Sequence, residues 1–101
     1  MITKGVNMNY LEISGEKYGS DDLASYAATK LSEIGVSSFQ RIQVSAQNNQ
    51  IAISFDEEED ALIACAIAGD QARTHSNIFQ SNDASGFLLS LFNIANQPGF
   101  C

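Results

Sequence analysis

The sequence predicts an α+β fold in which helices pack on one face of a small antiparallel sheet. Apolar residues recur at helical spacing in the second quarter of the chain and again near its end. Between them, alternating apolar and polar residues form a hairpin pattern. The expected order of elements is therefore strand, helix, strand, strand, helix, helix. A ferredoxin-like unit in which helix replaces the final strand is the alternative.

Size and composition favour one domain over residues 1–101, with residues 1–7 as a loose lead-in. The chain has 101 residues, 45% apolar and 17% charged, which suits a single core. Nothing repeats at a fixed period, and the single proline, Pro98, lies near the end. We therefore expect neither a linker nor a second domain.

The first strand is expected from about Val6 to Ile13, where Ser14 and Gly15 begin a loop. Ser20 is the predicted N-cap of the helix that follows. Gly35 is placed to end this helix in the left-handed conformation, with Val36 as the accompanying apolar contact. One stripe of apolar residues runs along the expected helix: Leu23, Ala27, Leu31 and Ile34.

Residues 40–55 predict a hairpin whose two-residue turn is Asn48-Asn49. A slip of one residue would expose the apolar set of one strand, so the two faces are strongly specified. One face is expected to pair Ala46 with Ile51, Val44 with Ile53 and Ile42 with Phe55. The other, wet face is expected to pair Ser45 with Ala52, Gln43 with Ser54 and Arg41 with Asp56.

A second helix is expected from Asp56, which resembles the first residue of a capping box completed by Glu59. The apolar run 61–68 and the polar residues after it predict that this helix reaches about Arg73, unless Gly69 ends it.

Residues 76–83 are expected to form a loop, after which Asp83 caps a last helix. Asn96, Pro98 and Gly99 should end this helix. Its expected apolar side consists of Phe87, Leu88, Leu91, Phe92 and Ala95.

Charge narrows the choice of partners. Five basic residues against 12 acidic ones give a net charge of −7 and a pI near 4.3. This charge argues against nucleic acid or an anionic membrane as a direct partner and leaves a basic protein surface open. Five of the acids are consecutive, from Asp56 to Asp60.

These consecutive acids and the wet face of the hairpin form the predicted partner-binding site. The alternative is that the acids only complement the helix dipole and keep this end of the hairpin soluble. A metal site is not expected, because consecutive helical residues fan out by about 100° each and do not converge. The predicted partner-binding residues are Asp56, Glu57, Glu58, Glu59, Asp60, Arg41, Gln43 and Ser54.

No catalytic, cofactor or metal residues are predicted. His75 is the only histidine, and Cys65, between two alanines, is typical of a small buried apolar residue. These two could meet only if Gly69 broke the helix. Gly15 and Gly19 precede a helix but match no phosphate-binding pattern.

Two cysteines, Cys65 and Cys101, without a CxxC pair, favour a reducing compartment, and we expect a cytoplasmic protein. The first nine residues lack the apolar core of a signal peptide. No apolar run approaches the roughly 20 residues of a membrane span.

The sequence is therefore expected to encode a non-enzymatic binding protein that inhibits a larger, basic or nucleic-acid-binding, protein. By size, charge and simplicity alone it is similar to bacterial immunity proteins and to phage-encoded inhibitors of host defence, including anti-CRISPR proteins. The alternative is an assembly subunit, for example a homodimer, that self-associates through an open hairpin edge or through its last helix, where Leu89 and Ile94 widen the apolar arc.

Overall fold

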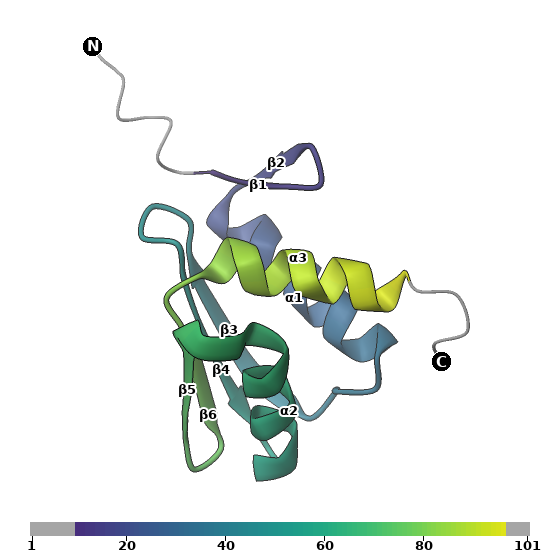
Figure 1. Cartoon of the computed structure of the whole chain (residues 1–101), viewed down its shortest axis with the longest axis vertical. Helices are drawn as coiled ribbons and strands as arrows, with labels where there is room; N and C mark the ends of the chain where they lie inside the picture. The colour runs from purple at the N-terminus through teal and green to yellow at the C-terminus, as the bar shows by residue number, and fades with distance from the viewer. Residues whose placement is uncertain (1–9, 97–101) are drawn as a thin grey trace.

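The computed structural model describes residues 10–96 and confirms the α+β fold with helices on one side of an antiparallel sheet (Figure 1). A four-stranded sheet and a separate two-stranded hairpin accompany three helices. In chain order the elements are β1 (Leu11–Ile13), β2 (Glu16–Tyr18), α1 (Ser20–Glu33), β3 (Phe39–Ser45), β4 (Gln50–Phe55), α2 (Glu58–Ala68), the short 3-10 helix η2 (Gly69–Gln71), β5 (Ala72–His75), β6 (Ile78–Ser81) and α3 (Ala84–Ala95).

The main sheet has the strand order β3-β4-β6-β5, and every neighbouring pair is antiparallel. Strands β5 and β6 correct the predicted order of elements, which had the second helix reaching Arg73 and a loop over 76–83. Gly69 has a φ of +81°, which stops α2 before the predicted end. After it, partly buried and exposed side chains alternate along β5, and buried and exposed side chains alternate along β6, so the chain forms a second hairpin.

The first predicted strand is shorter than expected within the described residues and belongs to a different sheet. Leu11–Ile13 pairs with β2 across a turn in which Ser14 and Gly15 have φ values of +55° and +87°. Residues 6–9 of the predicted strand and the predicted lead-in lie outside the described residues, as do Pro98, Gly99 and Cys101.

The β3–β4 hairpin has the predicted faces and a register shifted by two residues. Val44 pairs with Ile51 rather than Ile53, and residues 46–49 form the turn. A shift of two residues leaves each side chain on its own face, so alternation alone cannot choose between the two registers. Contacts in the turn select the observed register. The Ala46 amide donates to Ser20 Oγ at 3.0 Å, and Asn49 takes the left-handed conformation with a φ of +55°.

Of the predicted helix caps, those at Gly35 and Asp83 are confirmed, and those at Ser20 and Asp56 are wrong. Gly35 (φ +88°) ends α1, and the Val36 amide donates to the Leu31 carbonyl at 2.9 Å, as predicted. Asp83 caps α3 by accepting from the Gly86 amide at 3.1 Å, also as predicted. Gly19 is the N-cap of α1 rather than Ser20, whose hydroxyl accepts from the β3–β4 turn instead. The capping box at Asp56 is likewise wrong and is described with the site below.

The core lies between the helices and one face of the main sheet. Helix α1 packs on β3, α2 packs on β4, β5 and β6, and α3 contacts both other helices. The rings of Phe79 in β6 and Phe87 in α3 lie 4.8 Å apart at their centroids. The largest fully buried side chains are Phe55, Phe79, Phe87, Ile13, Leu23, Leu31, Ile53, Leu88 and Leu91.

Candidate functional site

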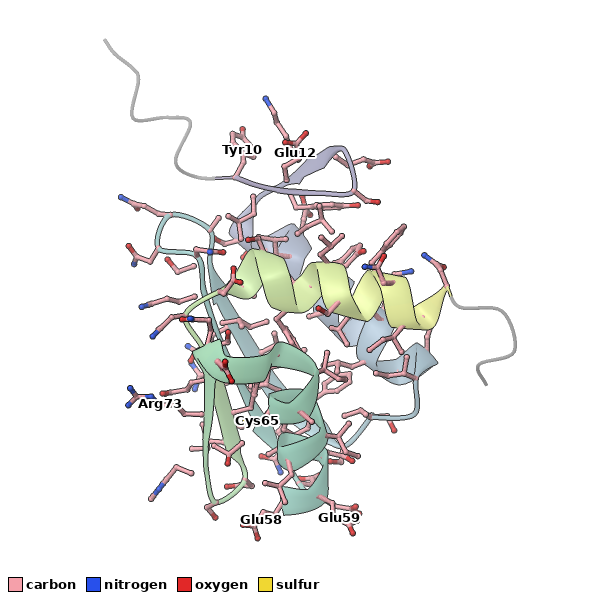
Figure 2. All side chains as sticks on the ribbon, viewed as in Figure 1. Tyr10, Glu12, Glu58, Glu59, Cys65 and Arg73 are labelled. Atoms are coloured by element: carbon pink, nitrogen blue, oxygen red, sulfur yellow. The ribbon has the colours of Figure 1, made fainter. Side chains whose placement is uncertain are left out.

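The eight predicted partner-binding residues fall on two adjoining surfaces of opposite charge. Asp56 to Asp60, here called the acidic cluster, connect β4 to α2 and form the first turn of that helix at one end of the sheet. Figure 2 shows Glu58 and Glu59 pointing away from the body of the protein at that end. Arg41, Gln43 and Ser54 instead lie on the sheet face that the helices leave free.

Backbone and side-chain contacts with Ser38, just before β3, and with Gln40 in β3 hold the acidic cluster in place. The Asp56 amide donates to the Ser38 carbonyl at 2.7 Å, and the Glu57 amide donates to the Ser38 hydroxyl at 3.3 Å. Asp60 accepts from the Ser38 amide at 3.3 Å, and Asp56 accepts from the side chain of Gln40. Because its carboxylate is used this way, Asp56 does not cap α2; Glu57 is the N-cap and makes no side-chain capping bond.

The carboxylates of the acidic cluster form no ion pair within the described residues. Asp56, Glu57, Glu58 and Glu59 are exposed, whereas Asp60 is partly buried. Over residues 10–96 the only ion pair joins Lys30 to Glu33, at 3.5 Å. The first-turn acids lie at the positive end of the α2 dipole, which stabilises their negative charge. Within residues 10–96, no group of three or more metal-ligating side chains converges.

The second surface is the open sheet face, which the described helices leave uncovered (Figure 1). It contains both arginines of the chain and its only histidine, and it contains no acid. Ala52 and Ile78 are apolar positions near its centre, and Ile78 is 38% exposed. The strand register and the alternation of burial place ten residues on it: Arg41, Gln43, Ser45, Gln50, Ala52, Ser54, Arg73, His75, Ile78 and Gln80.

Four of the ten residues of the open sheet face were missed by sequence reasoning because β5 and β6 were missed. Arg73 was assigned to a helix end and Ile78 and Gln80 to a loop, and His75 was assigned to no element. The signal that could have found them is period-two alternation, in which Thr74 and Phe79 point to the core side while their neighbours are exposed. In Figure 2 the side chain of Arg73 points away from the sheet on the side opposite the helices.

The lone histidine and the described cysteine are separated by the main sheet. His75 is exposed on the open sheet face, opposite Ile78. Cys65 is a free thiol of α2, partly buried and packed against the core on the other side of the sheet. The pairing of thiol and imidazole considered from the sequence therefore does not occur.

A third surface feature is apolar and lies on the two helices nearest the C-terminus. Leu62 and Ile63 of α2 are 52% and 44% exposed, and Leu89 of α3 is 43% exposed. Ile63 also lines a groove between the two helices. This groove is lined by Ile63, Ala66, Ile67, Ser90, Asn93 and Ile94.

Comparisons with known proteins assign no relative to this chain. No protein-family model matches it, and neither the curated proteins nor the solved structures contain a significant match. None of the helices formed by residues 10–96 combines the length and the apolar character needed to cross a bilayer.

Proposed function

We propose that this protein is a non-catalytic inhibitor that binds a larger protein at a basic surface. The observation that carries the proposal is the exposure of Asp56 to Glu59 without an ion pair in the described part of the chain. Clustered carboxylates that are not neutralised within their own protein raise the local negative potential and steer a positively charged partner toward it.

The support beneath the acidic cluster favours this role. Contacts to Ser38 and Gln40 fix the segment that carries the acids, so a partner need not order it on binding. Arg41 and Ser54 adjoin the cluster on the open sheet face and extend the contact surface. A basic groove that otherwise binds nucleic acid has the matching charge, which agrees with an inhibitor of the immunity-protein or phage anti-defence type.

The test begins with affinity capture of the partner from a host lysate at low ionic strength, followed by calorimetry with the purified partner. Glu57→Gln/Glu58→Gln/Glu59→Gln should weaken the complex about tenfold or more, since three short-range charge contacts are lost. The control Glu12→Gln/Glu16→Gln/Asp70→Asn removes the same number of charges from exposed positions elsewhere and should weaken it less than threefold.

Circular dichroism must show that both triple variants are folded, because acids in the first turn of α2 also stabilise that helix by a few tenths of a kcal/mol each. Equal loss of affinity in the two variants would mean that only net charge matters. Unchanged affinity in the cluster variant would mean that the acids serve the helix alone. Either result rejects the proposal.

Self-association is the second candidate function, and the exposed apolar residues of α2 and α3 favour it. Ile63 lines the groove between α2 and α3, Leu62 and Leu89 are exposed on the same two helices, and exposed apolar residues that gather in this way are typical of a contact surface. The small residues Ala61 and Ala64 of α2, in contrast, are buried within the chain, so α2 cannot use them to contact a second copy.

Analytical ultracentrifugation at low and high salt distinguishes this candidate from the first. An oligomer held by apolar contacts should persist at high salt. Leu89→Glu should then produce a monomer, whereas Thr29→Glu, at an exposed position of α1, should not. A monomer under all conditions removes this candidate.

A further inference from the structure

The open sheet face carries its two arginines at equivalent positions in the two halves of the main sheet. Each half consists of a helix followed by a hairpin: α1 with β3 and β4, and α2 with β5 and β6. At the centre of the sheet, Ile53 pairs with Phe79. Ile53 pairs on its other side with Ile42 of β3, and Arg41 is the residue before Ile42. Phe79 pairs on its other side with Thr74 of β5, and Arg73 is the residue before Thr74. The two arginines are therefore related by an approximate twofold axis normal to the sheet.

Their separation follows from the register. Arg41 and Arg73 lie on opposite edge strands, three strand spacings apart, and their cross-strand rows are adjacent. With about 4.8 Å between strands and about 3.3 Å per residue along them, the two Cα atoms are roughly 16 Å apart. Between them lie Ala52, Ser54, Ile78 and Gln80.

The charge of this face is opposite to that of the whole chain. Neither arginine makes an ion pair within residues 10–96, and the ten strand residues of the face include no carboxylate, whereas the chain has a net charge of −7. Guanidinium groups bind carboxylates through two parallel hydrogen bonds. Arginine is also enriched, and aspartate and glutamate depleted, at the centre of protein interfaces.

We propose that the open sheet face binds a short, extended, acidic segment of a protein, with one carboxylate on Arg41 and one on Arg73. Alternate side chains of an extended segment point the same way, so acids at its first and fifth positions are about 13 Å apart on one side. The flexible side chains of Arg41 and Arg73 make up the difference between this distance and the separation of their Cα atoms. The side chain at the third position of the bound segment points to the same side as the two acids and lies over Ala52 and Ile78.

The other polar residues of the face suit a peptide better than a nucleic acid. Gln43, Gln50 and Gln80 offer amide groups that can both donate to and accept from a peptide backbone. The face has no Phe, Tyr or Trp side chain for stacking against bases. The acidic cluster at one end of the face would repel a polyanion that continued past it, but not a segment that ends at the arginines.

This inference rests on the proposed function only in that the protein acts by binding. The proposed function uses the acidic cluster to bind a basic partner, whereas this inference uses the open sheet face to bind an acidic one. Two displayed peptide libraries provide the probe. One carries Glu or Asp at the first and fifth positions of a pentapeptide, and the other carries Gln or Asn there. We expect the wild-type protein to retain the acidic library at least fivefold better than the neutral one at low salt.

Arg41→Gln/Arg73→Gln should abolish this preference, while Lys17→Gln/Lys30→Gln, which removes two charges away from the main sheet, should preserve it. Arg41→Lys/Arg73→Lys should retain part of it, since charge remains but the paired hydrogen bonds are lost. Circular dichroism verifies that the variants are folded, and exposed strand positions tolerate these substitutions.

Equal retention of the two libraries, or a preference that survives in Arg41→Gln/Arg73→Gln, would overturn the inference. Arginine-dependent binding of a labelled single-stranded oligonucleotide that is tighter than that of the selected acidic peptides would also overturn it. Glu57→Gln/Glu58→Gln/Glu59→Gln should bind acidic peptides as well as the wild type or better. Failure of the acidic-cluster proposal is therefore distinguishable from failure of this one.

Discussion

The start of α3 offers a sharp test of the fold, because one carboxylate oxygen joins the helix to the β3–β4 turn. Asp83 Oδ1 accepts from the Gly86 amide at 3.1 Å, from the Ser85 hydroxyl at 3.3 Å and from Asn49 Nδ2 at 3.2 Å. Asn49 in turn accepts from the Ser85 amide at 2.8 Å through its side-chain oxygen. The perturbation of interest is Asp83→Ala, which removes all three bonds accepted by the carboxylate.

The expected loss is about 2 kcal/mol of unfolding free energy. Removing an N-cap side chain costs about 1 kcal/mol, and the partly buried bond from Asn49 to a charged acceptor adds about as much. For a domain of this size, that loss lowers the melting temperature by roughly 8–16 °C. Asp83→Asn should lose less, since asparagine caps helices as well as aspartate.

Gly86 makes the test specific. A Cβ atom at Gly86 would lie 2.2 Å from Asp83 Oδ2, so Gly86→Ala displaces the capping carboxylate. Without the cap, alanine is better than glycine in a helix by about 0.5–1 kcal/mol. We therefore expect Gly86→Ala to give no stabilisation, or to destabilise, in the wild type and to stabilise Asp83→Ala.

Urea unfolding of the two single variants and the double variant measures this coupling, which should be about 1 kcal/mol. Additive effects, or equal stabilisation by Gly86→Ala in both backgrounds, would refute the capping geometry at the start of α3.

Three further substitutions test other parts of the structure by chemical denaturation. The buried Tyr26 hydroxyl has no hydrogen-bond partner among residues 10–96, and burial, followed by negative charge nearby, raises the pKa of Tyr26 above 10.0. The folded chain then keeps this proton at pH values where the unfolded chain loses it, so stability falls above about pH 10. Tyr26→Phe should reduce that fall and change stability at pH 7 by between zero and about +1 kcal/mol; a steeper alkaline loss would contradict this assignment. Phe79→Ala should cost about 3–5 kcal/mol, because the ring is fully buried; a cost below about 1 kcal/mol would argue against its central position. Gly35→Ala should cost about 1 kcal/mol, since the position has a φ of +88°, and a stabilising effect would exclude this helix end.

Features set by local chemistry could be predicted from the sequence. Gly35 and Asp83 act where the sequence placed them, because a left-handed helix end and an N-cap each depend on a few neighbouring residues. The faces of the β3–β4 hairpin were also predictable, since each side chain either meets the core or does not.

Features set by distant contacts could not be predicted. The hairpin register depends on Ser20 and on α3, which hold the turn from far along the chain. Strands β5 and β6 are each four residues long, too short for alternation to outweigh the helical pattern before Gly69. Missing them hid four of the ten residues of the open sheet face, including Arg73, and with them the opposite charge of the two adjoining surfaces.

A nuclear magnetic resonance titration of the labelled protein with its captured and purified partner tests the central claim most directly. We predict that the amide signals of residues 56–60 and of the adjoining strand residues Arg41 and Ser54 shift or broaden first. The signals of the groove between α2 and α3, including Ile63 and Ile94, should not change. Perturbation confined to that groove, with the acidic cluster unaffected, would contradict the account.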